Sequence, residues 1–369
     1  MADVLIWDST ERSPELRHEL PVGIGDPFLY AERDGVRHVV IHAMEMPRLL
    51  ELDGPELELH PPEEFGYDDL IRSGLTRDAA LLEVAAHACT ALGVSRAAVP
   101  VMFPLSVADR LRAEGVELEP QSELFDLRRR AKTPAELAGI RRAQAAAEAG
   151  MSAAAELLRG SRPVTSEEIK AAIDAAFMAH ACSCDEFIVS HGAQSAIGHH
   201  MGEGAILPGE PVVIDIWPRD RESACFADMT RTFVIGEPTA ELVEWHRLVK
   251  EALDRSLELI RPGVRGREVF DAACEVFEAA GYATQRTKDP GSPLDHGFYH
   301  GLGHGVGLEV HEAPGMGFAG TDVLQAGDVV TVEPGLYRPG TGGCRLEDLV
   351  VVTDDGYENL TRFPYELQL

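Results

Sequence analysis

The feature that most constrains the fold is a repeated strand pattern. Residues 209–215 begin with a glycine, continue as a Val/Ile run and end in an acid six positions later, and residues 327–333 follow the same pattern. Each strand is followed by a turn and a second strand, at 227–233 and 345–351, that carries another acid. Apolar runs bounded by turn residues are typical of buried strands. Because two helices are also expected ahead of each hairpin, we infer a duplicated helix-plus-hairpin unit with pseudo-twofold symmetry.

Four acids in these hairpins are the first candidates for chemistry. They are Asp215, Asp228, Glu333 and Glu347. The two acids of a hairpin lie 13 residues apart in the first and 14 in the second. A carboxylate in an apolar strand is costly unless it is paired or bound to a cation. Arg231 and Arg345 could supply the opposite charge in two buried salt bridges, but the matched spacing of both hairpins favours metal ions.

A glycine-rich stretch lies between the two hairpins. Residues 301–311 read Gly-Leu-Gly-His-Gly-Val-Gly-Leu-Glu-Val-His, so glycines flank His304, and His311 follows seven positions later. Glycines let the backbone approach a bound group closely, although a flexible loop with two incidental histidines has the same pattern. Four carboxylates and one imidazole suit a pair of divalent ions bridged by carboxylates. Such a pair lowers the pKa of a bridging water, which would supply a hydroxide nucleophile near neutral pH.

The first third of the chain reads as a small α/β unit. Strands are predicted at 36–42 and 97–101, and helices at 77–92 and 105–114. No group of residues there has the spacing of a catalytic site. Four histidines are isolated along this part of the sequence and are interpreted as structural or surface groups: His38, His42, His60 and His87.

A domain boundary is predicted next to the basic run at 127–132. Thr133-Pro134-Ala135-Glu136 is a capping box with proline at the first helical position, and it opens an Ala-rich helix that reaches about residue 158. A second capping box, at 165–168, opens the next helix. A length of ~150 residues per domain also suggests two domains. The expected domains are residues 1–128 and 129–369.

Charge and cysteine content narrow the possible partners and location. The chain has 62 acidic against 33 basic residues, a net charge of -29, whereas nucleic acid or an anionic membrane would require a basic surface. No run approaches the ~20 apolar residues of a membrane span. The six cysteines lack the spacing of a disulfide framework, and the first residues lack the basic region of a secretory signal. We therefore expect reduced thiols in a cytoplasmic protein.

The five ligand candidates and their surroundings resemble a known family. Together with Gly-Leu-Gly-His-Gly-Val-Gly, Val-Glu-Pro-Gly-Leu-Tyr and Arg-Leu-Glu-Asp, they are similar to the pita-bread metallopeptidases, most closely the proline-peptidase branch of aminopeptidase P and prolidase. The resemblance is specific over 130–369. It implies an α+β chain with a C-terminal pita-bread domain and a smaller creatinase-like α/β domain before it. It also implies a homodimer with two divalent ions per subunit, Mn²⁺ being expected ahead of Co²⁺ or Zn²⁺.

The resemblance also assigns metal ligands. Asp215 would chelate the first metal, while Asp228 and Glu347 would bridge both metals. His304 and Glu333 would complete the second site. Glu333, as a ligand near the water, is also the family's candidate for moving the proton of the nucleophile.

Further site residues follow from the same resemblance. His199 corresponds to a histidine that assists the scissile peptide, and His311 to a second histidine on the substrate side. His300 corresponds to a pocket histidine, and Arg345 to an arginine kept near the bridging acid. Taken without the family, His199 and His300 would be interpreted as structural or solvent-facing groups.

Three positions depart from the family pattern. Trp217 stands two residues after Asp215, where glycine is commoner, and is expected to narrow one subsite. His200 replaces a usual tyrosine and could take the role of His199. Gly315 stands where several prolidases have an arginine that grips the carboxylate of a dipeptide, which weakens the dipeptidase interpretation.

The expected function is hydrolysis of a peptide bond next to proline, whose ring forms a tertiary amide without an N–H. Release of the N-terminal residue, as by an Xaa-Pro aminopeptidase, is the first expectation, and an Xaa-Pro dipeptidase is the alternative. Two minor alternatives are a non-catalytic binding module on the same fold and a metal-free hydrolase of the creatinase type. The five filled ligand positions argue against both.

Overall fold

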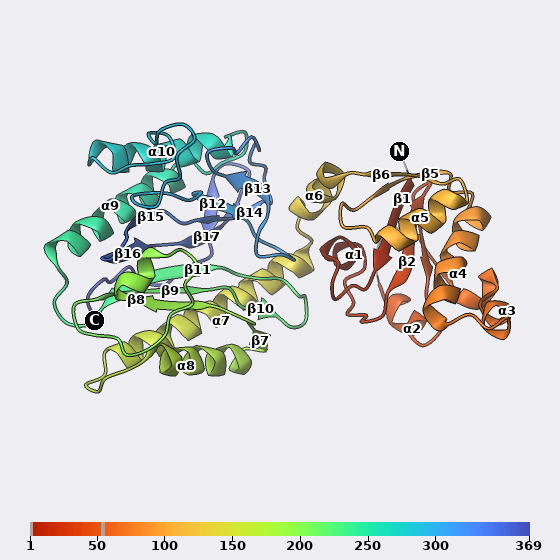
Figure 1. Cartoon of the computed structure of the whole chain (residues 1–369), viewed down its shortest axis with the longest axis horizontal. Coiled ribbons are helices and arrows are strands. Elements are labelled where there is room, and N and C mark those ends of the chain that lie inside the picture. Colours follow the sequence, from red (N-terminus) through yellow and green to blue (C-terminus); the bar gives the residue numbers. More distant parts are fainter. Residues whose placement is uncertain (1–2, 53–55) are drawn as a thin grey trace. The chain divides into compact units, whose positions relative to one another are not determined.

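The computed structural model describes residues 3–52 and 56–369. The chain divides into two compact units, residues 1–129 (unit 1) and 130–369 (unit 2) (Figure 1). Within the described ranges, no helix is long and apolar enough to cross a membrane.

Unit 1 is built on one six-stranded sheet in the order β4-β3-β2-β1-β5-β6. Neighbouring strands are antiparallel from β1 to β3 and parallel in the pairs β3–β4, β1–β5 and β5–β6. Side chains alternate between two apolar clusters, so that Leu5 packs on one face and Val4 and Ile6 pack on the other. The strands are β1 (Asp3–Asp8), β2 (Phe28–Arg33), β3 (Val36–Val40), β4 (Leu57–His60), β5 (Arg96–Val99) and β6 (Glu117–Pro120).

Helices cover both faces of this sheet. They are α1 (Pro14–Glu19), α2 (Met46–Leu49), α3 (Tyr67–Arg72), α4 (Arg77–Leu92), α5 (Leu105–Ala113) and α6 (Ser122–Arg130), with a 3-10 turn, η1 (Pro62–Phe65). The predicted helices at 77–92 and 105–114 and the predicted strands at 36–42 and 97–101 are confirmed within two residues at each end. α4 begins where the Thr76 hydroxyl accepts the N–H of Ala79, and it ends at Gly93 with φ +71°.

Two of the four histidines of unit 1 lie side by side in the fold. His38 and His60 are distant in sequence but not isolated in the fold, because β3 and β4 pair in parallel with His38 opposite Glu58 and Val40 opposite His60. The two imidazoles lie 3.3 Å apart between ring nitrogens. Register between strands joined by a long connection cannot be read from local spacing.

Unit 2 contains two antiparallel sheets, of order β11-β9-β8 and β13-β12-β14-β17-β18. Two short ladders, β7–β10 and β15–β16, accompany them. The strands are β7 (Cys182–Ser183), β8 (Ile188–His191), β9 (Pro211–Ile216), β10 (Arg219–Asp220), β11 (Met229–Val234), β12 (Gly303–Gly305), β13 (Glu312–Met316), β14 (Val329–Val332), β15 (Gly335–Arg338), β16 (Gly342–Arg345), β17 (Asp348–Val352) and β18 (Tyr357–Asn359).

Two pairs of helices flank these sheets as outer layers (Figure 1). They are α7 (Pro134–Leu158), α8 (Ser166–Ala179), α9 (Ala240–Leu257) and α10 (Gly266–Ala279). Residues of α7 and α8 share one apolar cluster with β9 and β11, while residues of α9 and α10 share another with β14 and β17. Two helices therefore precede each hairpin, and the predicted duplication is confirmed.

The helix starts of unit 2 follow local chemistry. The Thr133 hydroxyl accepts the N–H of Glu136 at 3.2 Å, and the Glu136 carboxylate accepts the N–H of Thr133 at 2.8 Å. Thr165 and Glu168 form the same reciprocal pair at the start of α8. Both predicted capping boxes are confirmed, and each satisfies amide groups that have no partner within the helix.

The second hairpin differs from the simple form that the sequence pattern predicts. β14 ends at Val332, and after Glu333 and Pro334 the chain forms the separate β15–β16 ladder before β17 begins at Asp348. Proline has no N–H to donate to a ladder, so the break falls where Pro334 stands. Glu333 and Glu347 consequently lie at the two ends of an insertion rather than inside regular strands.

Candidate metal centre

All five ligand candidates of unit 2 line one cavity of about 860 Å³. Asp215 lies in β9, and Asp228 immediately precedes β11, the antiparallel partner of β9. His304 is the central residue of β12, and Glu333 and Glu347 flank the β15–β16 insertion. The carboxylate of Asp228, the imidazole of His304 and the carboxylate of Glu347 offer ligand atoms that all lie within 4.8 Å of one another.

Glycines place His304 against the neighbouring strands. A Cβ on Gly303 would lie 2.1 Å from the Thr331 carbonyl oxygen, and one on Gly305 would lie 2.2 Å from that of Ala313. Any side chain at either position would push the strand away. The Nδ1 of His304 faces the Gly305 carbonyl at 3.1 Å, which leaves Nε2 toward the acids, at 3.4 Å from Glu333 and 3.8 Å from Asp228. A hydrogen bond on one ring nitrogen fixes the other as a ligand atom.

Burial and mutual repulsion raise the pKa values of the central acids. The pKa of Asp228 lies well above its ordinary value, first because of burial and then because of Glu347 and Asp215. Burial, Glu333 and Asp215 likewise raise the pKa of Glu347. Burial raises the pKa of Glu333 to about 8, against the lowering effect of Arg345. A cation would relieve this repulsion.

The donor set therefore fits a pair of divalent cations. The Oδ1 atom of Asp228 is buried and has no hydrogen-bond partner, which is rare for a carboxylate oxygen. Burial and the neighbouring His311 lower the pKa of His304 to about 4, so its imidazole is neutral, as a ligand must be. Carboxylates with one imidazole are the ligands of Mn²⁺-type and Zn²⁺-type ions.

The two arginines of the hairpins have different partners. Arg345 pairs with Asp215, and its guanidinium also donates to the Tyr337 hydroxyl at 2.9 Å. Arg231 instead pairs with Asp348 at 3.0 Å. The alternative of two salt bridges to the acids therefore holds for Asp215 alone. Among the described residues, no Arg or Lys forms an ion pair with the other three acids.

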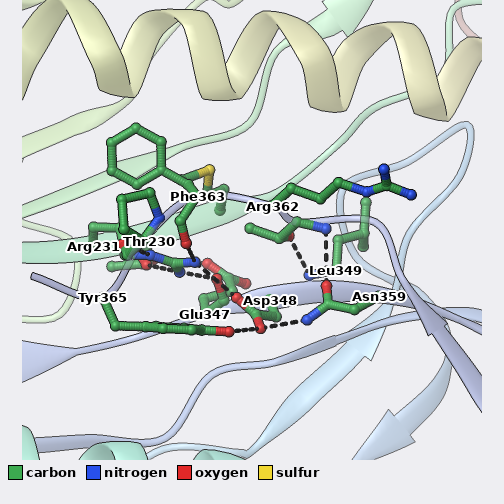
Figure 2. A network of polar contacts seen from close by, with 12 residues as sticks. Thr230, Arg231, Glu347, Asp348, Leu349, Asn359, Arg362, Phe363 and Tyr365 are labelled. Atoms are coloured by element: carbon green, nitrogen blue, oxygen red, sulfur yellow. Dashed lines mark hydrogen bonds and ion pairs between the residues drawn. The ribbon is translucent and has the colours of Figure 1, made fainter.

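Arg231 and Asp348 form the centre of a buried network next to the ligands (Figure 2). Arg231 is fully buried and donates to the backbone carbonyls of Glu347, at 2.7 Å, and Thr230, at 2.9 Å. The same guanidinium donates to the carbonyls of Phe363 and Pro364. Arg231 therefore links the backbone at Glu347 to the backbone at Phe363 and Pro364.

The carboxylate of Asp348 completes the network. Its second oxygen accepts hydrogen bonds from the Asn359 amide at 2.7 Å and from the Tyr365 hydroxyl (Figure 2). The Arg231 guanidinium also lies 4.4 Å above the Tyr365 ring. Both charges are thus compensated by protein groups.

Sequence reasoning missed two residues that hydrogen-bond to cavity-lining side chains. The Thr230 hydroxyl donates to Glu347 at 2.7 Å and accepts from Arg345 at 3.2 Å. Thr230 could have been found from the sequence, because it stands two residues after Asp228 and its side chain therefore points to the same side of the strand. Tyr337, which also contacts His300 at 2.9 Å, is separated from it by 37 residues and gave no local signal.

The cavity also contains the other predicted site residues. His199, His300, His311, Arg345 and Trp217 line it, whereas His200 and Gly315 are not among its lining residues. The Nδ1 of His200 accepts the N–H of Gly202 at 3.0 Å. Burial and Arg345 lower the pKa of His300 to about 3, and burial and His199 lower the pKa of His311.

The chain is similar in sequence to known peptidases. The sequence profile of metallopeptidase family M24 matches residues 138–354. The Xaa-Pro dipeptidase of Pyrococcus furiosus is 34% identical over 240 residues, which span 64% of this chain and 64% of the relative, slightly less than two thirds of its length. The probable dipeptidase PepE of Mycobacterium tuberculosis is 34% identical over 272 residues, 73% of this chain and 68% of the relative.

A solved structure supports the fold. The Xaa-Pro dipeptidase from Bacillus anthracis is similar with a TM-score of 0.82 and 26% identity, over 100% of this chain and 95% of that one. The expected α+β architecture with a pita-bread fold is confirmed.

Proposed function

The chain belongs to metallopeptidase family M24, and on that premise we propose that it is a two-metal exopeptidase that hydrolyses the peptide bond next to proline. The observation that carries the proposal is the convergence of four carboxylates and His304 in one cavity, with an unpartnered buried oxygen on Asp228. Two divalent cations bound there would polarise the peptide carbonyl and lower the pKa of a water molecule.

The residues of the chain that would hold the metals are Asp215, Asp228, His304, Glu333 and Glu347. Asp215 contacts Arg345 through Oδ2, and we propose that it binds a cation through its other oxygen. Glu333, with a pKa raised to about 8 before a cation binds, is the group we assign to proton transfer. The positive charge of two bound cations would lower the pKa of Glu333, so that its carboxylate could accept a proton from the water and then give it up.

Substrate contacts are assigned to the histidines and aromatic groups of the cavity. We propose that His199 and His311 hydrogen-bond the scissile peptide and that His300, held by the Tyr337 hydroxyl, lines the subsite beside them. The proline ring would pack against the apolar lining, where Trp217 and Ile188 stand. Trp217 would thereby narrow the subsite.

The favoured substrate is an Xaa-Pro dipeptide. The sequence alone placed release of an N-terminal residue from longer peptides first, but the relatives from Pyrococcus and Mycobacterium are both named dipeptidases. One observation keeps the longer substrate as a second candidate. Among the described cavity-lining residues, the only arginine or lysine is Arg345, which is already paired with Asp215, so the carboxylate of a dipeptide would lack a dedicated cation.

An assay that identifies the products distinguishes the dipeptidase from the aminopeptidase. The Mn²⁺-loaded protein is incubated with Ala-Pro, Ala-Pro-Ala and a longer Xaa-Pro peptide, with Ala-Ala as the control, and products are identified by mass spectrometry. Cleavage of Ala-Pro alone supports the dipeptidase, and release of the first residue from the longer peptides supports the aminopeptidase. Loss of a C-terminal residue contradicts the Xaa-Pro assignment, and no cleavage of any peptide by metal-loaded protein contradicts the enzyme.

The role of His199 has a matched control in its neighbour. His199→Ala should keep both metals and lower kcat by about 10²–10⁴-fold, the usual contribution of a positioned proton donor or acceptor. His200→Ala, which removes a group outside the cavity lining, should leave kcat within about twofold. Steady-state kinetics with metal analysis measures both. A larger loss of kcat in His200→Ala than in His199→Ala would assign the substrate contact to His200 instead.

A further inference from the structure

A second group of metal-binding side chains lies in unit 1, outside the peptidase cavity. It consists of His38 on β3 and Glu58 and His60 on β4. Glu58 and His60 are two positions apart and so point to the same face of β4. The parallel register places His38 directly opposite Glu58. Two adjacent strands therefore fix all three side chains on one face of the sheet.

The ligand atoms of this group form a compact triangle. The Nδ1 of His38 lies 3.2 Å from the Glu58 carboxylate and 3.3 Å from the Nε2 of His60. The Nε2 of His60 lies 3.8 Å from the same Glu58 oxygen. Ligand atoms about 2.0–2.1 Å from a tetrahedral ion are separated by about 3.3–3.4 Å. Two edges of this triangle are close to that separation, and the third, between His60 and Glu58, is longer at 3.8 Å.

Neighbouring groups hold the imidazoles in ligand orientation. The Nδ1 of His60 contacts the Glu64 carboxylate on η1 at 3.0 Å, an arrangement that leaves Nε2 as the ligand atom. The side chains of His38 and His60 are largely buried, with 12% and 17% of their surface exposed, whereas that of Glu58 is 49% exposed. Solvent can thus reach the open side of the triangle.

A hydrogen-bonded cluster without an ion is the competing explanation. One proton on His38 would then have to serve two acceptors, the Glu58 oxygen and the His60 nitrogen. The distance of 3.3 Å between the ring nitrogens is long for such a bond. A cation satisfies all three groups together.

We propose that His38, Glu58 and His60 form a separate transition-metal site in unit 1, which takes Zn²⁺ or a similar imidazole-binding ion and has a fourth position open to water. Two imidazoles and one carboxylate prefer Zn²⁺, Co²⁺ or Ni²⁺, whereas the acid-rich cavity of unit 2 also suits Mn²⁺. The ion would fasten the edge strand β4 to β3. This site is independent of the proposed function, because it shares no residue with the peptidase cavity.

Counting bound ions tests the proposal. The full-length protein is stripped with a chelator, equilibrated with Zn²⁺ and analysed by native mass spectrometry. The wild-type chain should bind one Zn²⁺ more than His60→Ala or Glu58→Gln. The matched control is His87→Ala, an exposed imidazole of the same unit, which should bind as many ions as the wild type. Equal numbers of ions in the wild type, His60→Ala and Glu58→Gln would overturn the site.

Two further measurements keep the test decisive. Glu58→Gln changes a half-exposed side chain without a change of volume, so it remains informative if His60→Ala fails to fold. Glu64→Gln should weaken Zn²⁺ binding about 10–100-fold, because it removes the group that orients His60. Mn²⁺-supported peptidase activity should stay within about twofold in Glu58→Gln. Parallel loss of activity and of the extra ion would overturn the independence of the two sites.

Discussion

The two hairpins of unit 2 repeat one sequence pattern but deliver their acids differently. The first is a continuous ladder, β9 with β11, and supplies two aspartates. In the second the β15–β16 insertion interrupts the chain between β14 and β17, and two glutamates stand at its ends. The glutamate side chain is one methylene longer, so a more irregular backbone still brings its carboxylate to the common cavity. The duplicated pattern therefore determines the arrangement of the strands, and the length of each acidic side chain determines where its carboxylate lies.

The arginines of the two hairpins also differ, because one contacts the scaffold and the other contacts a proposed ligand. Arg231, from the first hairpin, is directed away from the ligand carboxylates and pairs with Asp348. Arg345, from the second, faces the cavity and pairs with Asp215 of the first hairpin. One arginine therefore stabilises the scaffold, and the other sets the charge of the site.

The largest effect is expected from removing one proposed metal-bridging acid of each hairpin. Asp228→Asn and Glu347→Gln each remove a charge that the cations need, so both should lose metal and abolish measurable turnover. Asp254→Asn, on the exposed face of α9, is the control and should behave as the wild type. Elemental analysis and kinetics measure the outcome. Normal turnover by Asp228→Asn would show that Asp228 is not a required metal ligand.

The next effect distinguishes the two arginines. Arg231→Met leaves Asp348 buried without its partner and should cost about 3–5 kcal/mol of unfolding free energy. Arg345→Met should chiefly lower kcat at saturating metal, because it frees Asp215. Denaturant unfolding and kinetics separate these results. The double variant Arg231→Met/Asp348→Leu should recover part of the lost stability, and its failure to do so would show that the pair does not act as a unit.

A smaller effect compares two buried threonines on β11. Thr230→Val removes a hydrogen bond to the Glu347 carboxylate, worth about 1.5–3 kcal/mol, and should weaken metal affinity about tenfold. The Thr232 hydroxyl donates to the carbonyl and accepts the N–H of Arg345, and neither of these hydrogen bonds goes to a proposed metal ligand. Thr232→Val should lower stability without changing metal affinity. Metal titration of both variants at one pH is the measurement, and equal affinities would exclude a positioning role for Thr230.

The last prediction is a pH dependence of the unfolding free energy of the metal-free protein. The pKa of Glu333 is raised to about 8 in the fold from an ordinary value near 4.5, so the protonated form is favoured by folding. Its contribution to stability is fully present below pH 4.5 and is lost as the pH rises through 8, with a slope of at most about 1.4 kcal/mol per pH unit. Unfolding in EDTA between pH 5 and 9 measures it. Glu333→Gln should flatten the curve, and an unchanged slope would assign the effect to another group.

The sequence predicted what depends on local or duplicated patterns. The capping boxes at Thr133 and Thr165, the helix pairs and the two hairpins follow from spacing alone, and the structure has them. The choice of arginine partners could not be predicted, because Arg231 and Asp348 are 117 residues apart and meet only when both hairpins pack. The contact between His38 and His60 was missed for the same reason, since it depends on the register of β3 with β4.

The network around Arg231 also sets an order of events during synthesis. Every ligand acid leaves the ribosome before Phe363 and Pro364, whose carbonyls accept two of the hydrogen bonds from Arg231. Until that segment is made, the guanidinium that supports the Glu347 backbone lacks these partners, and burying it is unfavourable. The acids would therefore come together late in translation. A nascent chain that lacks this segment would hold its carboxylates on a less rigid backbone, and we expect it to bind metal ions more weakly than the full chain does.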